Sequence, residues 1–250
     1  MRYFLRLSYD GTDFHGWQRQ PNAPSVQQKI EEALGTVLRR DTPVTGAGRT
    51  DTGVHAREMY AHFDSDAPFD PEALKRSLNN MCGHSIAIHD IMRVRDDAHA
   101  RFDATARTYQ YRIITRKDPF EDRYAWRLQQ IPDLDVMNWA AALLLLTADF
   151  TSFAKLHADA KTNICNVTKA AWTIDEATGV ITFTITADRF LRNMVRAVVG
   201  TLIEVGRHKL SIPEFRQVIR AKDRCEAGMS VPAKGLFLTR IEYPDDIFKV

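Results

Sequence analysis

A glycine-bearing loop with two charged residues offers the clearest chemistry in the sequence. It spans residues 46–56 and reads Gly-Ala-Gly-Arg-Thr-Asp-Thr-Gly-Val-His-Ala. Gly46 and Gly48 are expected to permit backbone conformations that are closed to other residues, so that the loop presents Arg49 and Asp51 on a rigid scaffold. An aspartate is ionised at neutral pH, and a neighbouring guanidinium favours that form. The loop is therefore predicted to present an ionised carboxylate, and polar residues this dense between two regular elements indicate a functional site.

The glycine spacing of this loop also tests whether it binds phosphate. The spacing is G-x-G-x4-G, whereas a dinucleotide-binding loop needs G-x-G-x-x-G and a P-loop needs G-K-[ST]. Neither pattern matches, which weakens the interpretation as a nucleotide-dependent enzyme. The local pattern leaves open that the loop is an ordinary turn with a solvated Arg-Asp pair.

Three arginines recur with helical spacing after Asp188. Arg189, Arg192 and Arg196 stand at i, i+3 and i+7 in a segment whose apolar residues would form a wide buried stripe. They are expected to share one edge of a helix near residues 190–205. Such a row is often a solvated face, but this one begins directly after a predicted strand end.

Histidine and cysteine residues give no support for a metal site. The eight histidines include no HExxH motif and no Cys/His cluster with ligand spacing. His55 and His62 are interpreted as structural hydrogen-bonding residues. Cys82, Cys165 and Cys225 lie far apart and are odd in number, which favours reduced, buried thiols over a disulfide framework.

Hydrophobic periodicity predicts the elements that must position these residues. A helix is predicted to begin after Ser25, which forms a capping box with Gln28, and to continue through Arg40. The predicted strands are 3–9, 57–64, 86–91, 108–115, a hairpin of 166–174 with 180–187, and 236–243. The other predicted helices are one that starts at 70–71, and 135–146, 190–205 and 213–220.

Composition and length indicate a folded protein. The chain has 250 residues, 44% of them hydrophobic, which allows one large domain or two small ones and excludes disordered and fibrous classes. Its longest apolar run, residues 139–146, is far shorter than the roughly 20 residues of a membrane-spanning helix. The N-terminus alternates like a strand instead of resembling a signal peptide, so a cytoplasmic location is expected. A net charge of +2 neither supports nor excludes RNA as a partner.

The order of these elements predicts an α+β fold. Two pseudo-repeated split β-α-β (ferredoxin-like) halves are expected, residues 1–100 with the glycine loop and residues 101–250, each with helices on one face of a mostly antiparallel sheet. No linker rich in Pro, Gly or Ser separates them. The halves are therefore expected to pack as one body with a central cleft.

Five ordered sequence blocks resemble the tRNA pseudouridine synthase A family, and together they extend from end to end of the chain. The blocks are Tyr-Asp-Gly-Thr-Asp-Phe-His-Gly-Trp-Gln-Arg-Gln at 9–20, Gly-Arg-Thr-Asp-Thr-Gly-Val-His-Ala at 48–56, Phe-Asp-Ala-Thr-Ala-Arg-Thr-Tyr-Gln-Tyr-Arg at 102–112, Phe-Leu-Arg-Asn-Met-Val-Arg at 190–196 and Gly-Leu-Phe-Leu at 235–238. Two departures are Thr52, where the family usually has Ala, and the segment 57–60, which replaces a Gly-Gln-bearing stretch. They leave target choice open.

The resemblance implies an isomerase that converts uridine to pseudouridine at positions 38, 39 or 40 of the tRNA anticodon arm. Asp51 would be the catalytic aspartate, Tyr109 would stack on the target uracil, and Arg196 would lie beside the aspartate. The resemblance also implies a homodimer that needs no cofactor or metal. Without it, Tyr109 would be interpreted as a core or sheet-face aromatic, because it alternates with Tyr111.

The resemblance further implies that the target base is flipped out of its helix, since no side chain reaches a stacked nucleotide. Arg49 and the segment His99, Arg101 and Phe102 are candidates for holding the flipped conformation, and Arg189, Arg192 and Lys161 are candidates for phosphate contacts. A noncatalytic RNA-binding module is the alternative. It is disfavoured because binding alone has no use for a carboxylate that repels phosphate.

Overall fold

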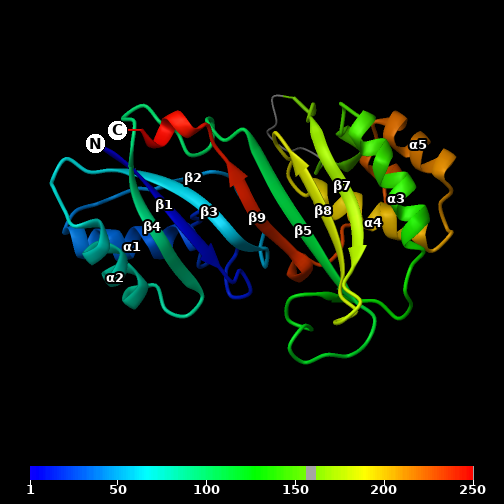
Figure 1. Cartoon of the computed structure of the whole chain (residues 1–250), viewed down its shortest axis with the longest axis horizontal. Coiled ribbons are helices and arrows are strands. Elements are labelled where there is room, and N and C mark those ends of the chain that lie inside the picture. Colours follow the sequence, from blue (N-terminus) through cyan, green and yellow to red (C-terminus); the bar gives the residue numbers. More distant parts are fainter. Residues whose placement is uncertain (156–161, 250) are drawn as a thin grey trace. The chain divides into compact units, whose positions relative to one another are not determined.

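The computed structural model of the chain describes residues 1–155 and 162–249 (Figure 1). It divides into two compact units, Met1–Arg107 with Phe237–Val250, and Thr108–Leu236, called here unit 1 and unit 2. No helix in the described part of the chain is both long and apolar enough to cross a membrane.

The sheet of unit 1 has the strand order β4-β1-β3-β9. These strands are β1 (Arg2–Tyr9), β3 (His55–Asp64), β4 (Ile86–Val94) and β9 (Leu236–Glu242, whose first residue belongs to unit 2). Strand β1 pairs antiparallel with both β3 and β4, and β9 pairs parallel with β3 at His55 and Ala56. The short strand β2 (Thr45–Gly46) pairs antiparallel with β3 at His62 and Ala61, and the chain then continues into the loop that carries Asp51.

Two amphipathic helices complete unit 1, α1 (Val26–Leu38) and α2 (Pro71–Met81). They pack against each other, and α2 also packs against β4. The buried face of α1 carries Val26, Ile30, Ala33 and Leu34, at the spacing expected for an amphipathic helix. Each helix begins at a side-chain cap, Ser25 or Asp70, that accepts a backbone N–H of the first turn.

In the described residues of unit 2, the strand order is β5-β8-β7 and three α-helices accompany the strands. The elements are β5 (Ala106–Ile114, whose first two residues belong to unit 1), β6 (Trp126–Arg127), α3 (Leu134–Ala142), β7 (Val167–Ile174), β8 (Ile181–Ala187), α4 (Met194–Gly206) and α5 (Ile212–Ala221). Strands β7 and β8 form an antiparallel hairpin, and α3 packs against both β7 and α4. Among the described residues, short 3-10 segments lie in unit 2 at Leu143–Leu146, Thr151–Phe153, Arg224–Glu226 and Ala233–Gly235, and in unit 1 at Asp245–Phe248.

The α+β class and the mostly antiparallel pairing are confirmed, and the predicted elements are all present with small shifts at their ends. The predicted helix 135–146 ends as an α-helix at Ala142 and continues as a 3-10 turn. Ser25 accepts the N–H of Gln28 at 3.2 Å, but the Gln28 side chain donates to Glu32, so only half of the predicted capping box forms. A complete box instead begins α5, between Ser211 and Glu214.

The predicted arginine row on one helix edge is wrong. Helix α4 begins at Met194, because Asn193 adopts a left-handed conformation (φ 67°, ψ 0°) that breaks the helical path. Arg189 and Arg192 therefore precede the helix, and only Arg196 lies on it.

Candidate active site

The loop 47–54 carries Arg49 and Asp51, is bonded to β3 at its start and is closed by a turn at its end. At its start, the Ala47 N–H donates to the Tyr60 carbonyl at 2.8 Å. At its end, the Val54 N–H donates to the Asp51 carbonyl at 3.1 Å, which closes a turn through Gly53, whose φ of 75° favours glycine. Arg49 is exposed and Asp51 is half-buried. The carboxylate thus stands on a closed turn that leads directly into a strand.

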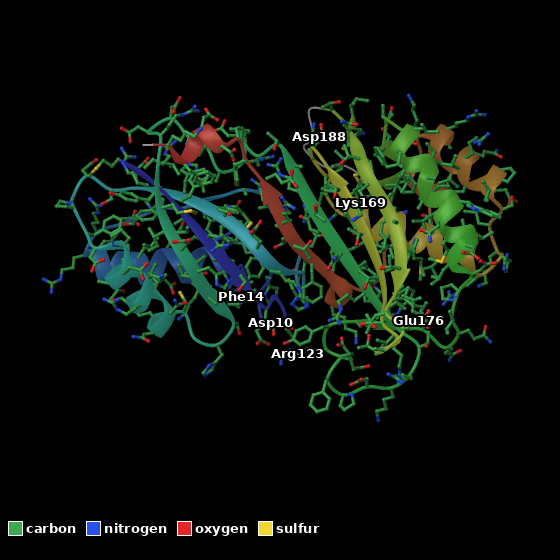
Figure 2. All side chains as sticks on the ribbon, viewed as in Figure 1. Asp10, Phe14, Arg123, Lys169, Glu176 and Asp188 are labelled. Atoms are coloured by element: carbon green, nitrogen blue, oxygen red, sulfur yellow. The ribbon has the colours of Figure 1, made fainter. Side chains whose placement is uncertain are left out.

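The segment 10–17, on which Figure 2 labels Asp10 and Phe14, packs against this loop. A Cβ on Gly11 would lie 2.0 Å from the Val54 carbonyl oxygen, and one on Gly16 would lie 2.3 Å from that of Thr50. The Phe14 carbonyl accepts the Gly53 N–H at 3.3 Å. Only glycine at positions 11 and 16 permits this close approach of the two backbones.

Thr50, the residue before Asp51, is held by two aromatic residues. Its hydroxyl makes a buried hydrogen bond of 2.8 Å with the Tyr9 hydroxyl, and its carbonyl accepts the Trp17 backbone N–H at 3.3 Å. Trp17 is buried, and its ring covers Gly46, where a Cβ would lie 2.4 Å from the ring. The backbone beside the carboxylate is therefore fixed from the core side.

The reason predicted for the first two loop glycines is wrong. Neither Gly46 nor Gly48 has a positive φ. Gly46 is required by the Trp17 ring, and a Cβ on Gly48 would meet open space. The positive φ angles lie instead at Gly53 and at Gly16, with φ 89°, in the packing segment.

His55 and His62 are confirmed as structural hydrogen-bonding residues. The His55 Nδ1 accepts the Gly11 N–H at 3.0 Å, and its ring stacks on Phe237 with centroids 4.6 Å apart. The His62 Nδ1 accepts the Ala100 N–H at 3.1 Å. Burial lowers the pKa of His62 to about 4, so this acceptor stays neutral at physiological pH.

The turn at 99–104 presents Arg101 and Phe102. The His99 Nδ1 accepts the backbone N–H groups of Arg101 and Phe102 at 3.1 and 3.3 Å, and burial lowers the pKa of His99 below its usual value. The Phe102 side chain is 72% exposed, with its ring 4.2 Å from that of His99. The Arg101 guanidinium lies 5.7 Å from the centre of the Phe102 ring. An exposed aromatic face beside a cation suits a nucleic-acid base.

Arg107 connects this turn to the aspartate loop. Its guanidinium donates to the carbonyls of Ala47 at 3.2 Å, Ala104 at 2.8 Å and Arg101 at 2.5 Å. Unit 1 thus brings together two predicted groups, the loop with Arg49 and Asp51 and the turn with His99, Arg101 and Phe102. Arg107 is absent from the predicted site residues, because a backbone carbonyl that accepts a hydrogen bond leaves no signal in a sequence.

Unit 2 carries Tyr109 and Arg196. Tyr109 is half-buried on β5, with its ring edge-to-face against Phe190 at 5.0 Å and 83°. The Arg196 Nε donates to the Val231 carbonyl at 2.7 Å, and the Val231 N–H donates back to the Arg196 carbonyl at 3.2 Å. Tyr111, on the same face of β5, is fully buried and donates to the Pro232 carbonyl at 2.8 Å; burial raises its pKa. Arg196 and Tyr111 therefore hold adjacent residues of one segment.

The residues predicted to contact phosphate lie between β8 and α4 or outside the described part of the chain. Arg189 follows Asp188, labelled in Figure 2, whose carboxylate accepts the Arg189 N–H at 2.7 Å. Arg192 is exposed, and its carbonyl accepts the Lys155 N–H at 3.0 Å. Lys161 lies outside the described residues.

Titratable side chains do not gather into a metal site in the part of the chain that the structure describes. No group of three His, Cys, Asp or Glu residues there lies close enough to hold an ion. Cys82 and Cys165 are buried free thiols, and burial raises the pKa of Cys165 to about 11. Cys225 is exposed, which corrects the expectation that all three cysteines are buried.

Comparison with known proteins gives a consistent family match. A family model described as tRNA pseudouridine synthase matches residues 7–103 and 140–244, ranges that include Asp51 and Arg196, with Tyr109 in the interval between them. The tRNA pseudouridine synthase A of Bacteroides fragilis is 55% identical over 250 residues, with 99% of this chain and 98% of that protein covered. That of Parabacteroides distasonis is 52% identical over 250 residues, covering 100% and 98%. That of Maricaulis maris is 39% identical over 246 residues, covering 97% and 98%.

Proposed function

The chain belongs to the tRNA pseudouridine synthase family, and from this premise we propose that Asp51 is the residue through which it isomerises uridine to pseudouridine in tRNA. The conversion of tRNA uridine to pseudouridine is the activity of the family. The division of that reaction among particular residues is our proposal. The observation that carries it is the loop 47–54, which holds a half-buried carboxylate on a closed turn fixed by Tyr9, Trp17 and the 10–17 segment.

The chemistry requires a carboxylate with a fixed position. The N1–C1′ bond of uridine breaks, the uracil turns over, and a C5–C1′ bond forms, while the C5 proton leaves and N1 gains a proton. If the Asp51 carboxylate attacks C1′, it displaces N1 of the uracil and is itself displaced when C5 bonds to C1′. If it adds to C6 of the base, it leaves C6 after the C5–C1′ bond has formed, when loss of the C5 proton restores the C5–C6 double bond. Such a nucleophile acts best in a near-attack position, so a rigid backbone beside it lowers the barrier.

Tyr109 and Arg196 are proposed to act on the same nucleotide as Asp51. Extrusion of a stacked uracil costs a few kcal/mol, and an aromatic platform worth roughly 1–3 kcal/mol per base offsets much of it. The edge-to-face contact with Phe190 supports this role for Tyr109, because it fixes the ring plane. Arg196 is proposed to pair with the Asp51 carboxylate. Its Nε bond to the Val231 carbonyl supports this, because that bond fixes the base of the guanidinium.

The remaining predicted residues are proposed to hold the tRNA. Arg49, His99, Arg101 and Phe102 would stabilise the flipped conformation, and Arg189, Arg192 and Lys161 would bind phosphates. The exposed Phe102 ring beside Arg101 supports the first group.

The finer features implied by the resemblance are part of the proposal. They are modification at positions 38, 39 or 40 of the anticodon arm, base flipping, a homodimer, a cytoplasmic location, and a central cleft between two pseudo-repeated halves, residues 1–100 and 101–250, packed as one body. For the first half, one observation supports a split β-α-β unit: β3 and β4 are joined through α2, and both pair antiparallel with β1, which lies between them.

Release of tritium from tRNA labelled at uridine C5 tests the role of Asp51. Asp51→Asn should abolish release and keep tRNA binding, whereas Asp41→Asn, at an exposed site on the same unit, should change neither. Release that survives in Asp51→Asn would disprove the proposal. A wild-type chain that binds tRNA but releases no tritium would instead be a noncatalytic RNA-binding module. Mapping of pseudouridine in the product tRNA tests the predicted positions.

A further inference from the structure

Arg107 makes an unusual set of contacts for an arginine at the start of a strand. Its guanidinium donates to three backbone carbonyls from two separate segments, Ala47 in one and Arg101 and Ala104 in the other. A guanidinium suits this arrangement because it presents five N–H donors in a rigid plane, whereas a lysine ammonium is a point charge on a flexible stem.

The first segment is the start of the Asp51 loop. Ala47 is buried, and its N–H already donates to the Tyr60 carbonyl of β3 at 2.8 Å. Arg107 binds the carbonyl of the same residue, so the peptide groups on both sides of Ala47 are held. The four residues that follow it, 48–51, therefore start from a backbone position that is fixed.

The second segment is the turn with Arg101 and Phe102, which has anchors of its own. The Tyr243 hydroxyl donates to the Ala100 carbonyl at 2.5 Å, and His62 accepts the Ala100 N–H. The turn therefore behaves as one rigid piece of unit 1. Arg107 joins that piece to the Asp51 loop, whereas the Tyr243 hydroxyl bonds only the turn, at Ala100, among the described residues.

We propose that Arg107 is a positioning residue that sets the Asp51 loop against the 99–104 turn, so that the carboxylate and the Arg101–Phe102 tip meet the RNA at a fixed separation. This inference rests on the proposed role of Asp51. Loss of the guanidinium frees the Ala47 carbonyl and lets the loop move against the turn. A misplacement of about 1 Å can cost on the order of a hundredfold in rate. The tRNA contacts themselves remain, so binding is retained.

Single-turnover kinetics of the full-length protein with uridine-labelled tRNA test the inference. Arg107→Gln should lower the single-turnover rate at least tenfold, about 1.4 kcal/mol in the barrier, and leave the Kd for tRNA within about threefold. Arg107→Lys keeps the charge and loses the planar donor set, so its rate should fall between those of Arg107→Gln and the wild type.

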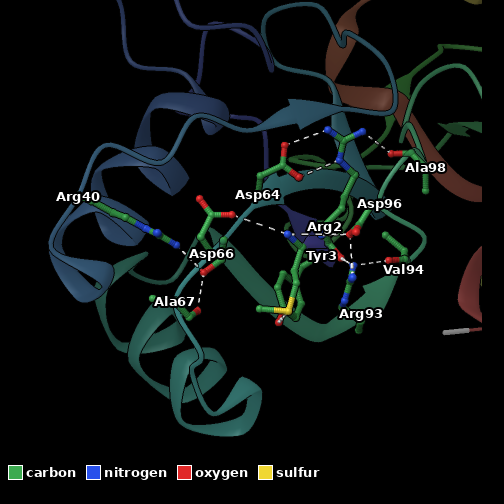
Figure 3. A network of polar contacts seen from close by, with 12 residues as sticks. Arg2, Tyr3, Arg40, Asp64, Asp66, Ala67, Arg93, Val94, Asp96 and Ala98 are labelled. Carbon is green, nitrogen blue, oxygen red and sulfur yellow. Dashed lines mark hydrogen bonds and ion pairs between the residues drawn. The ribbon is translucent and has the colours of Figure 1, made fainter.

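Arg93 provides a matched control, shown in Figure 3. Its guanidinium also donates to two backbone carbonyls of unit 1, those of Arg2 at 2.9 Å and Val94 at 2.5 Å, and pairs with Asp96 at 2.7 Å, so that its contacts involve neither the Asp51 loop nor the 99–104 turn. Arg93→Gln should therefore lower the melting temperature and leave the single-turnover rate within twofold, measured where every variant is folded.

Three results would overturn the inference. One is a set of Arg107 variants that lose only thermal stability, as Arg93→Gln should. Another is a loss of tRNA affinity at an unchanged rate, which would make Arg107 an RNA contact. The third is an unchanged rate in Arg107→Lys if Arg107→Gln does not fold. Asp51→Asn in the same series separates the two proposals. Release retained there disproves the role of Asp51, whereas release lost there with normal Arg107 variants disproves only the positioning role.

Discussion

Replacement of Gly16 by alanine should impair catalysis, because Gly16 packs against the backbone of Thr50 and Asp51. Gly16 has a φ of 89°, and a Cβ there would lie 2.3 Å from the Thr50 carbonyl oxygen and 3.2 Å from the Asp51 carbonyl carbon. Real Cβ contacts are essentially never shorter than 3.0 Å, so the two backbones must separate by about 0.7 Å, from 2.3 to 3.0 Å. That displacement reaches the residue before the carboxylate.

The energetic cost has two parts. A left-handed conformation costs a non-glycine residue about 1–2 kcal/mol, and the collision with Thr50 adds to it, for a total of about 2–4 kcal/mol in the free energy of unfolding. The displaced carboxylate should lower kcat on the order of ten- to a hundredfold. The Kd for tRNA should change little, because no RNA contact is removed.

Gly83 supplies a control in which alanine would incur only the cost of the left-handed conformation, without a collision. Gly83 also has a positive φ, 72°, but a Cβ there would meet nothing within 4 Å. It follows the C-terminal end of α2, more than thirty residues after Asp51 in the sequence. Gly83→Ala should therefore lose about 1–2 kcal/mol of stability and keep normal kcat. Urea unfolding and tritium release, measured at a temperature where both variants are folded, give the comparison. Equal kcat values in the two variants would refute the link between Gly16 and the carboxylate.

Three other perturbations have defined outcomes. Tyr109→Phe should keep most tRNA affinity and turnover because the ring face survives, while Tyr109→Ala should lose turnover strongly; equal behaviour in the tritium assay would contradict stacking. The pKa of His62 is lowered from about 6.5 in the unfolded chain to about 4 in the folded protein, so the unfolded chain binds the proton first as the pH falls. The free energy of unfolding should therefore decrease between pH 6.5 and pH 4 by on the order of 3 kcal/mol. Urea unfolding of His62→Gln should lack that part of the pH dependence. Affinity for tRNA should fall with salt, and Arg192→Gln should flatten the plot of log K against log salt by up to about 0.9, whereas an unchanged slope would remove Arg192 from the interface.

The strands and helices could be predicted because their signals are local. Apolar residues alternate along β1, and Val26, Ile30 and Leu34 repeat with helical spacing in α1, so each element is visible within its own segment. The start of α4 was misjudged because its apolar stripe extends backwards through Leu191, while a single left-handed residue, Asn193, decides where the helix begins. Periodicity contains no information on such a conformation.

For the candidate site, the sequence predicts several of the residues but not how they are held in space. Asp51 and its glycine loop stand out in the sequence, and the resemblance named Tyr109 and Arg196. The residues that fix the loop could not be found in this way, because Gly11, Gly16 and Arg107 act on carbonyl groups, and every residue has a carbonyl. Spacing also gave the wrong reason for Gly46, since the ring it accommodates belongs to Trp17, almost thirty positions earlier.

The pairing of β9 with β3 has a consequence for the synthesis of the protein on the ribosome. The Ile241 N–H binds the Glu58 carboxylate across 183 positions, and Phe237 stacks on His55, at the strand that leaves the Asp51 loop. At about 5–20 residues per second, the ribosome finishes β9 roughly 10–40 s after β3. During that interval the nascent chain exposes an unpaired sheet edge, which is a template for aggregation. A truncated mRNA that ends before codon 237 would therefore yield a chain without β9. Its sheet edge at β3 would stay unpaired, although the proposed catalytic residues would all be present.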